Sequence, residues 1–297
     1  MARAADRIPD NAPGDVFVDT SCIDCDLCRQ LAPATFARSG AAGQSFVVAQ
    51  PRDEASARRA ALALVACPTA SIGAARLDVR SASRAFPEPI EGAADVLFCG
   101  YASARSYGAS SYLVVRPADR GGNVLVDSPR IARPLVEQLR ALGGVSTMFL
   151  THRDDVADHA LFREAFGCVR VIHRRDLDAG TRDVEHVLEG DAPIALDDEL
   201  LALPVPGHTA GSTALLLRDE TLFTGDHLWW SDERRALHAS RGVCWWSWAA
   251  QTRSMATLLD RRFTRVLPGH GRRHLAATPE AMRADLAALV AWMEARP

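Results

Sequence analysis

Residues 151–159 read Thr-His-Arg-Asp-Asp-Val-Ala-Asp-His and directly follow an apolar run at residues 146–150. The run predicts a buried strand, so the stretch after it forms a loop at a strand end. The loop carries two histidines and three aspartates. Imidazole nitrogens and carboxylate oxygens are the ligands that suit zinc, iron or manganese. The stretch predicts a metal site; the alternative is a charged loop that faces solvent.

Three more ligand-type residues follow strand-like runs in the C-terminal half. They are His208 in Pro-Gly-His-Thr-Ala-Gly-Ser, Asp226 in Thr-Gly-Asp-His and His270 in Pro-Gly-His-Gly. Because each follows a strand-like run, as the loop at 151–159 does, the four segments favour one shared metal site over scattered surface histidines.

With these ligands in this order, residues 95–275 resemble the metallo-β-lactamase superfamily, and most of all its glyoxalase II-type hydrolases. The resemblance implies a four-layer αββα sandwich with a metal site at one edge, between the sheets. The order of ligands in that family is a histidine-rich loop, a histidine, a bridging aspartate and a histidine. His208, Asp226 and His270 match the last three.

The loop departs from the family pattern His-x-His-x-Asp-His. Aligned from the front, the resemblance implies two metal sites bridged by Asp226. Site one holds His152, Asp154 and His208, and site two holds Asp158, His159 and His270. Asp226 and Asp158 are then the candidate catalytic carboxylates. Aligned from the back, His152 falls outside the pattern. Asp155 could replace Asp154 as a ligand, or neither binds and only one metal is held firmly.

Other residues near these motifs have two interpretations. Asp127 ends a strand-like run and is a candidate to orient a ligand histidine. His227 lies beside Asp226 and either touches the site or is a surface or core residue. The tryptophans gather in the same region and form either core or a substrate wall; they are Trp229, Trp230, Trp245, Trp246 and Trp248. The remaining histidines of the C-terminal half are interpreted as surface or core residues; they are His173, His186, His238 and His274.

The N-terminal part carries a cysteine pattern. Cys22, Cys25 and Cys28 form C-x2-C-x2-C, and Cys67 directly precedes Pro68. Bacterial ferredoxins bind cubane clusters with this pattern; the alternatives are a zinc knuckle or cysteines that only pack in the core. Ala32 stands where a cysteine of a second cluster would lie, which favours one cluster. The segment resembles a monocluster 4Fe–4S ferredoxin, which implies electron transfer or redox sensing.

A linker separates the two parts, since residues 80–94 contain two prolines and a glycine without a hydrophobic period. We therefore expect an α+β ferredoxin-like domain at 15–82 and the αββα metallo-β-lactamase sandwich at 83–297. Periodicity predicts helices at 53–66, at 131–142 and from Thr278 onward. It predicts strands at 16–18, 45–48, 95–99, 111–116, 123–127, 146–150, 169–173, 201–205, 214–217 and 221–224.

The bulk composition narrows the partners. The 297 residues have a net charge of −3, which gives no general attraction to nucleic acid or anionic membrane. The first 14 residues show no signal-peptide pattern, and no window reaches the roughly 20 apolar residues of a membrane span. We expect a cytoplasmic protein that acts on a small-molecule substrate, with a redox partner protein as the second partner implied by the cluster.

Three functions fit these observations. The resemblance implies a metal-dependent hydrolase of the ester or thioester type with an accessory iron–sulfur domain. The carboxylate-rich loop favours iron or manganese over zinc, so an iron-dependent oxidoreductase or oxygenase fed by the cluster is the alternative. A non-catalytic redox sensor is the third. The expected cofactors are one 4Fe–4S cluster and one or two divalent metals, which are zinc or, alternatively, iron or manganese.

Overall fold

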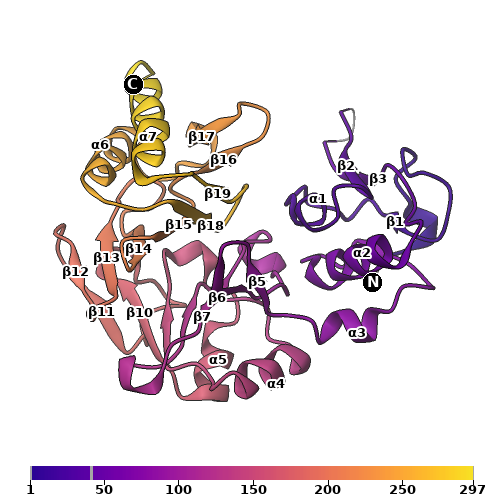
Figure 1. Cartoon of the computed structure of the whole chain (residues 1–297), viewed down its shortest axis with the longest axis horizontal. Helices are drawn as coiled ribbons and strands as arrows, with labels where there is room; N and C mark the ends of the chain where they lie inside the picture. The colour runs from indigo at the N-terminus through magenta and orange to yellow at the C-terminus, as the bar shows by residue number, and fades with distance from the viewer. Residues whose placement is uncertain (1, 41–42, 297) are drawn as a thin grey trace. The chain divides into compact units, whose positions relative to one another are not determined.

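The computed structural model describes residues 2–40 and 43–296 (Figure 1). Contacts in space divide the chain into two compact units. Unit 1 holds residues 1–124, 129–146 and 160–167, and unit 2 holds residues 125–128, 147–159 and 168–297. The division therefore runs through strand β8 (Val124–Val126). It follows spatial contacts only, so the expected domain boundary between residues 82 and 83 stays a prediction.

The N-terminal segment of unit 1 contains two short antiparallel pairs, β1 with β4 and β2 with β3. Its elements are β1 (Phe17–Val18), α1 (Leu27–Leu31), β2 (Phe36–Arg38), β3 (Ser45–Val47), α2 (Glu54–Ala66), β4 (Ile72–Gly73) and α3 (Val79–Ser83). Helix α2 starts at a capping box, in which the Asp53 carboxylate accepts a hydrogen bond from the Ser56 amide at 2.7 Å. The predicted helix at 53–66 is confirmed, and Cys67 directly follows its last turn.

A seven-stranded sheet has the order β11-β10-β9-β8-β7-β6-β5. Its strands are β5 (Glu88–Ile90), β6 (Ala93–Phe98), β7 (Tyr112–Val114), β8, β9 (Thr147–Phe149), β10 (Val169–His173) and β11 (His186–Leu188). Strands β5 to β7 pair antiparallel within unit 1, and β9 to β11 pair parallel within unit 2. The intervening helices are α4 (Arg133–Ala141) and α5 (His159–Phe166).

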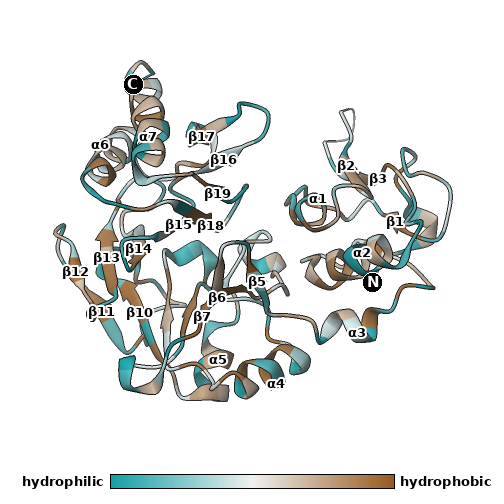
Figure 2. Cartoon of the chain, in the orientation of Figure 1, coloured by the Kyte–Doolittle hydropathy of each residue, from teal (hydrophilic) through white to brown (hydrophobic). Residues whose placement is uncertain are grey.

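A six-stranded sheet lies wholly in unit 2, in the order β12-β13-β14-β15-β18-β19. Its strands are β12 (Ile194–Ala195), β13 (Leu200–Pro204), β14 (Thr213–Leu217), β15 (Thr221–Gly225), β18 (Arg265–Pro268) and β19 (His274–Leu275). Every residue of β14 and β15 is buried, and β13 and β14 are coloured as mainly hydrophobic in Figure 2. A small hairpin of β16 (Trp229–Ser231) and β17 (Ala236–His238) follows β15.

Two helices of unit 2 pack on the core of this sheet, α6 (Trp248–Thr257) and α7 (Pro279–Glu294). Helix α7 begins at Thr278, whose hydroxyl accepts from the Ala281 amide, and Pro279 occupies its first turn. Its predicted face is confirmed as buried in the core; the residues are Met282, Leu286, Leu289, Val290 and Met293.

The predicted strands are all present, with ends shifted by a few residues at most, and the predicted helix at 131–142 is α4. Within residues 2–40 and 43–296, periodicity missed nine strands, which are only two to four residues long; they are β2, β4, β5, β11, β12, β16, β17, β18 and β19. It also gave no helix at α5, which begins at the last residue of the loop at 151–159. No helix of the described residues is long and apolar enough to cross a bilayer.

Replacing Leu286 by alanine tests the packing of α7. Leu286 is 1% exposed in the core of unit 2, so Leu286→Ala should lower the free energy of unfolding by about 2–5 kcal/mol. Urea unfolding monitored by circular dichroism measures the loss. The exposed Arg283 on the same helix gives the control, and Arg283→Ala should change it by no more than about 0.5 kcal/mol. Equal effects at the two positions would contradict this packing.

Candidate functional site

The ligand-type residues all follow strands of unit 2. His152 follows β9, His208 follows β13, Asp226 directly follows β15 and His270 follows β18. A single 3₁₀ turn, Arg153–Asp155, continues the chain after His152. Strand ends that meet at one edge of a fold therefore bring these distant segments together, as the sequence predicts.

Their side chains converge. The Nε2 atoms of His152 and His208 lie 3.8 and 3.7 Å from the same Asp226 oxygen, Oδ2. Asp154 Oδ2 is 3.3 Å from His208 Nε2, and Asp155 Oδ2 is 3.9 Å from His152 Nε2. Two groups within this cluster could hold a metal ion: His152, Asp154 and His208, and His152, Asp155 and Asp226. His270 joins through Asp226, with its Nδ1 2.7 Å from Oδ1.

The polar atoms at the centre of the cluster fit a cation. His152 Nε2, His208 Nε2 and both Asp155 oxygens are buried, and no hydrogen-bond partner among the described residues satisfies them. Burying such atoms without a partner is costly, and buried charges are paired or coordinate metals. A divalent cation bound by these atoms would satisfy them together.

Hydrogen bonds fix which imidazole nitrogen faces the cluster. His208 Nδ1 donates to the Val243 carbonyl at 2.5 Å, which leaves the Nε2 lone pair for a ligand. His152 Nδ1 lies 2.9 Å from Thr151 Oγ1, and that hydroxyl donates in turn to Asp127 at 3.0 Å. Asp127 also accepts from the Thr151 amide at 2.8 Å. Asp127 is thus linked to His152 through Thr151, which is the position that the interpretation of Asp127 requires.

Burial and charge shift the pKa values in opposite directions here. Burial lowers the pKa of His152 to about 4 and raises that of Asp127 to about 7. Burial also raises the pKa of Asp155 well above its ordinary value, and the charge of Asp226 adds to the rise. Burial disfavours the Asp226 carboxylate as well, but the charge and hydrogen bond of His270 outweigh it and hold its pKa well below the usual range.

Glycine at position 269 lets two carboxylates approach the same point. A Cβ there would lie 2.5 Å from Asp155 Oδ2 and 3.1 Å from Asp226 Oδ1. Any larger residue would displace one of these side chains. The glycine of the Pro-Gly-His motif is therefore explained by space next to the carboxylates.

Asp176 joins the loop of Asp154 to the loop of His208, a role that was not predicted from the sequence. Its fully buried carboxylate accepts from the amides of Arg153 and Gly211 and from the Thr209 hydroxyl, at 2.6–3.1 Å. The loop that holds Asp154 and the loop that holds His208 therefore keep a fixed spacing. Its sequence context, Arg-Arg-Asp-Leu, gives no signal for this role.

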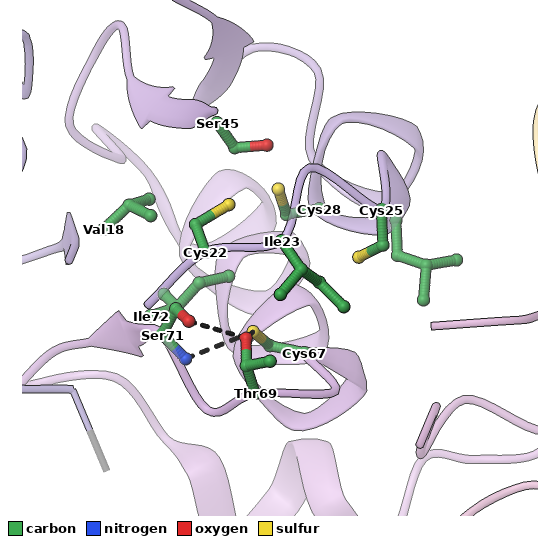
Figure 3. A pocket seen from close by; sticks show the side chains of 11 residues that line it. Val18, Cys22, Ile23, Cys25, Cys28, Ser45, Cys67, Thr69, Ser71 and Ile72 are labelled. Atoms are coloured by element: carbon green, nitrogen blue, oxygen red, sulfur yellow. Dashed lines mark hydrogen bonds between the residues drawn. The ribbon is translucent and has the colours of Figure 1, made fainter. Parts of the chain in front are cut away.

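A second site lies in unit 1, where Cys22, Cys25, Cys28 and Cys67 line one cavity (Figure 3). Burial raises the pKa values of Cys25 and Cys28 to about 12, and the charges of other cysteines in the group add to both rises. Four thiols that line one cavity, Cys28 buried and the other three partly buried, fit a shared iron–sulfur cluster, in which iron replaces the protons. The Ser71 amide donates to Cys67 Sγ at 3.3 Å.

Comparisons with known proteins give one matching family and several similar structures. Residues 18–74 match the family described as the 4Fe-4S single cluster domain of Ferredoxin I. The chain is similar to the crystal structure of the metallo-β-lactamase DIM-1, with 15% identity, 68% of this chain and 96% of that chain covered, and a TM-score of 0.50. For the structure of TMB-1 the values are 16%, 68%, 96% and 0.52.

The chain joins a 4Fe–4S ferredoxin domain to a metallo-β-lactamase fold. The predicted fold class, an α+β ferredoxin-like domain followed by an αββα sandwich, is thereby confirmed. ETHE1 from Myxococcus xanthus is also similar, with 19% identity, 66% of this chain and 89% of that chain covered, and a TM-score of 0.46. At these identities the structures show the fold, and a comparison with curated protein sequences gives no match.

In the metallo-β-lactamase fold of this chain, Asp158 and His159 do not join the cluster predicted for them. His159 starts helix α5; its Nδ1 accepts from the Arg170 guanidinium at 3.0 Å and its Nε2 donates to the Gly180 carbonyl at 3.1 Å. Both ring nitrogens are therefore used. No metal-binding group among the described residues contains Asp158 or His159, and Asp155 stands beside Asp226 instead.

In the ferredoxin domain, Arg29 stabilises the loop that carries Cys22, Cys25 and Cys28. This role was not predicted from the sequence. Asp24 and Asp26 lie between the cysteines in left-handed conformation, with φ of 60° and 68°. The buried Arg29 guanidinium bonds Asp24 at 2.8 Å and Asp26 at 2.5 Å, and also donates to the Ser45 hydroxyl. These ion pairs fix the turns that direct the cysteines toward one cavity.

The tryptophans divide between core and surface. Trp248 is 8% exposed and packs in the core, whereas Trp245 and Trp246 are 62% and 52% exposed. The amides of these two donate to the His208 carbonyl at 3.0 and 3.1 Å. The exposed pair therefore lies next to His208. His227 is fully buried, and burial lowers its pKa to about 3.

Exchanging two aspartates of the loop tests the ligand set. Because Asp155 faces Asp226 and Asp158 does not, Asp155→Asn should weaken binding of the metal at least about tenfold. Asp158→Asn is the matched control and should leave binding unchanged. Competition with a chelator and metal analysis of the purified proteins measure both. A larger loss at Asp158 than at Asp155 would restore the ligand set predicted from the family pattern.

Gly108 tests the packing around the cluster within unit 1. A Cβ at Gly108 would lie 2.6 Å from Cys25 Cβ and 3.2 Å from its Sγ, so Gly108→Ala should reduce the iron content and visible absorption. Gly190→Ala is the control, because its φ of +90° matches the +88° of Gly108 but open space surrounds it. In both variants alanine adopts a left-handed backbone conformation, which costs about 1–3 kcal/mol. The two variants therefore differ only in the contact with Cys25. Equal loss of the cluster in both would refute the contact.

Proposed function

We propose that the C-terminal domain is a metal-dependent hydrolase of esters or thioesters, with the ferredoxin domain as an accessory. The observation that carries the proposal is the convergence of His152 Nε2, His208 Nε2 and the Asp155 carboxylate beside Asp226. These three groups are buried, and no hydrogen-bond partner among the described residues satisfies them. His270 binds next to Asp226 in this proposal, and Asp155 takes the place predicted for Asp158 and His159.

Each side chain has a definite task in this proposal. His152, His208 and the carboxylates hold one or two divalent metals, which supply Lewis-acid polarisation of a carbonyl and a water of lowered pKa. Asp226 and Asp155 accept hydrogen bonds from the attacking water and orient it. Thr151 and Asp127 keep His152 in the tautomer that leaves Nε2 free to bind. The exposed indoles of Trp245 and Trp246 are a wall for a small-molecule substrate.

A specific observation favours the second candidate, an iron-dependent oxidoreductase. Asp154, Asp155 and Asp226 all lie within the cluster, so its ligands are richer in oxygen than a site of histidines alone. Such ligation favours iron or manganese over zinc. The ferredoxin domain, with one 4Fe–4S cluster and a redox partner protein, would then supply electrons.

Metal content and turnover decide between the two candidates. Purified without oxygen, the hydrolase should hold about four irons in the cluster and up to about two zincs, and should cleave esters or thioesters. His208→Ala should lower kcat/KM at least about a hundredfold, because a metal ligand is lost. Cys67→Ser removes a cluster ligand and should leave hydrolysis intact. Loss of all activity with Cys67→Ser, together with about five or six irons and no zinc, would establish the oxidoreductase instead.

A further inference from the structure

A groove of about 610 Å³ lies in unit 2 between helix α6 and the end of strand β13, and the metal ligands do not line it. Its size falls within the range of ligand pockets, roughly 300–1,000 Å³. The floor is apolar and includes Leu203, Pro204 and Leu258. Charged side chains stand around it, and an indole forms one wall.

The groove starts beside the loop of the metal ligand His208. Trp246 lines the groove, and its amide donates to the His208 carbonyl at 3.1 Å. Pro206 also lines it, and its carbonyl accepts from Ser254 Oγ of α6 at 2.8 Å. Both ends of the His208 loop are therefore tied to the walls of the groove. A ligand in the groove would therefore lie next to the His208 loop.

The charges around the groove favour an anion. Arg175 is paired with Asp191, at 2.5 and 3.1 Å between guanidinium nitrogens and carboxylate oxygens. Arg253, exposed on α6, and the half-buried Arg261 have no hydrogen bond or ion pair from their guanidinium groups among the described residues. Asp260 is the one further acid in the lining, so two unpaired guanidinium groups face one unpaired carboxylate. Arginine forks bind phosphate with paired hydrogen bonds.

The exposed face of Trp246 adds a second requirement. The side chain is 52% exposed although it is large and apolar. An indole that stands free next to arginines offers a stacking surface for a flat ring, and base stacking on an aromatic side chain contributes about 1–3 kcal/mol. The groove thus combines an anion site, an aromatic wall and an apolar floor.

We infer that this groove binds the nucleoside phosphate part of the substrate, as carried by thioesters of coenzyme A. Arg253 and Arg261 bind the phosphate groups, and Trp246 stacks on the base. The acyl end then extends along the His208 loop to the metal ligands. The inference rests on the proposed hydrolase function and specifies its substrate class.

Binding of ADP to the full-length, metal-loaded protein tests the groove without any reaction. Isothermal titration calorimetry should show saturable binding that weakens as salt rises. Arg253→Gln and Arg261→Gln should each weaken ADP binding at least about tenfold, and Trp246→Leu about tenfold. Arg262→Gln is the matched control, because Arg262 is exposed and adjacent but does not line the groove. Circular dichroism checks that each variant is folded.

Turnover then separates this inference from the proposed function. The kcat/KM ratio of a coenzyme A thioester to the same acyl thioester of N-acetylcysteamine, which lacks the nucleotide, should fall at least about tenfold in Arg253→Gln. If ADP binding depends on the arginines but no thioester is hydrolysed, the groove is a nucleotide site and the proposed hydrolase function is wrong. Hydrolysis with no ADP binding, or with glutathione thioesters preferred, overturns the groove. If equimolar inorganic phosphate displaces ADP, the groove recognises phosphate alone, and the inferred binding of the nucleoside is wrong.

Discussion

The arrangement of the candidate metal site in the C-terminal domain depends on the buried carboxylate of Asp226. Burial disfavours its charge, and three imidazoles around it favour that charge. Each imidazole follows a different strand, so β9, β13 and β18 must all be in place before the charges meet. The remaining arrangement follows from this constraint: glycine at position 269 leaves space for a second acid, and Asp176 fixes the spacing of the loops.

The same constraint decides what the sequence could reveal. His208, Asp226 and His270 were predictable because each stands alone between a strand and a glycine-containing turn. The loop after β9 offers three acids, and the sequence alone does not say which one faces Asp226. A single 3₁₀ turn selects Asp155, and His159 is instead bound by Arg170 and Gly180, which lie elsewhere in the chain. Such choices depend on tertiary contacts that have no local pattern.

Buried ionic side chains hold the loops of both domains. Arg29 joins two aspartates between the cluster cysteines, as Asp176 joins two ligand loops beside the metal cluster. In each case one buried charge receives several hydrogen bonds, which offsets the cost of its burial. These residues were not predicted because an isolated arginine or aspartate in a sequence shows nothing of its neighbours. The fold class, by contrast, was implied by family resemblances that depend on the order and spacing of the cysteines and of the histidine and aspartate motifs.

Cys67 directly follows helix α2, whereas the other three cluster cysteines lie near the start of the chain. A cofactor bonded to all four sulfurs would link the loop of Cys22, Cys25 and Cys28 covalently to the end of helix α2. Maturation of the N-terminal domain is therefore linked to folding: iron and sulfide can be fully enclosed only after α2 has formed and docked. In cells short of iron, the newly made chain would carry this domain as a protease-sensitive segment without its cluster.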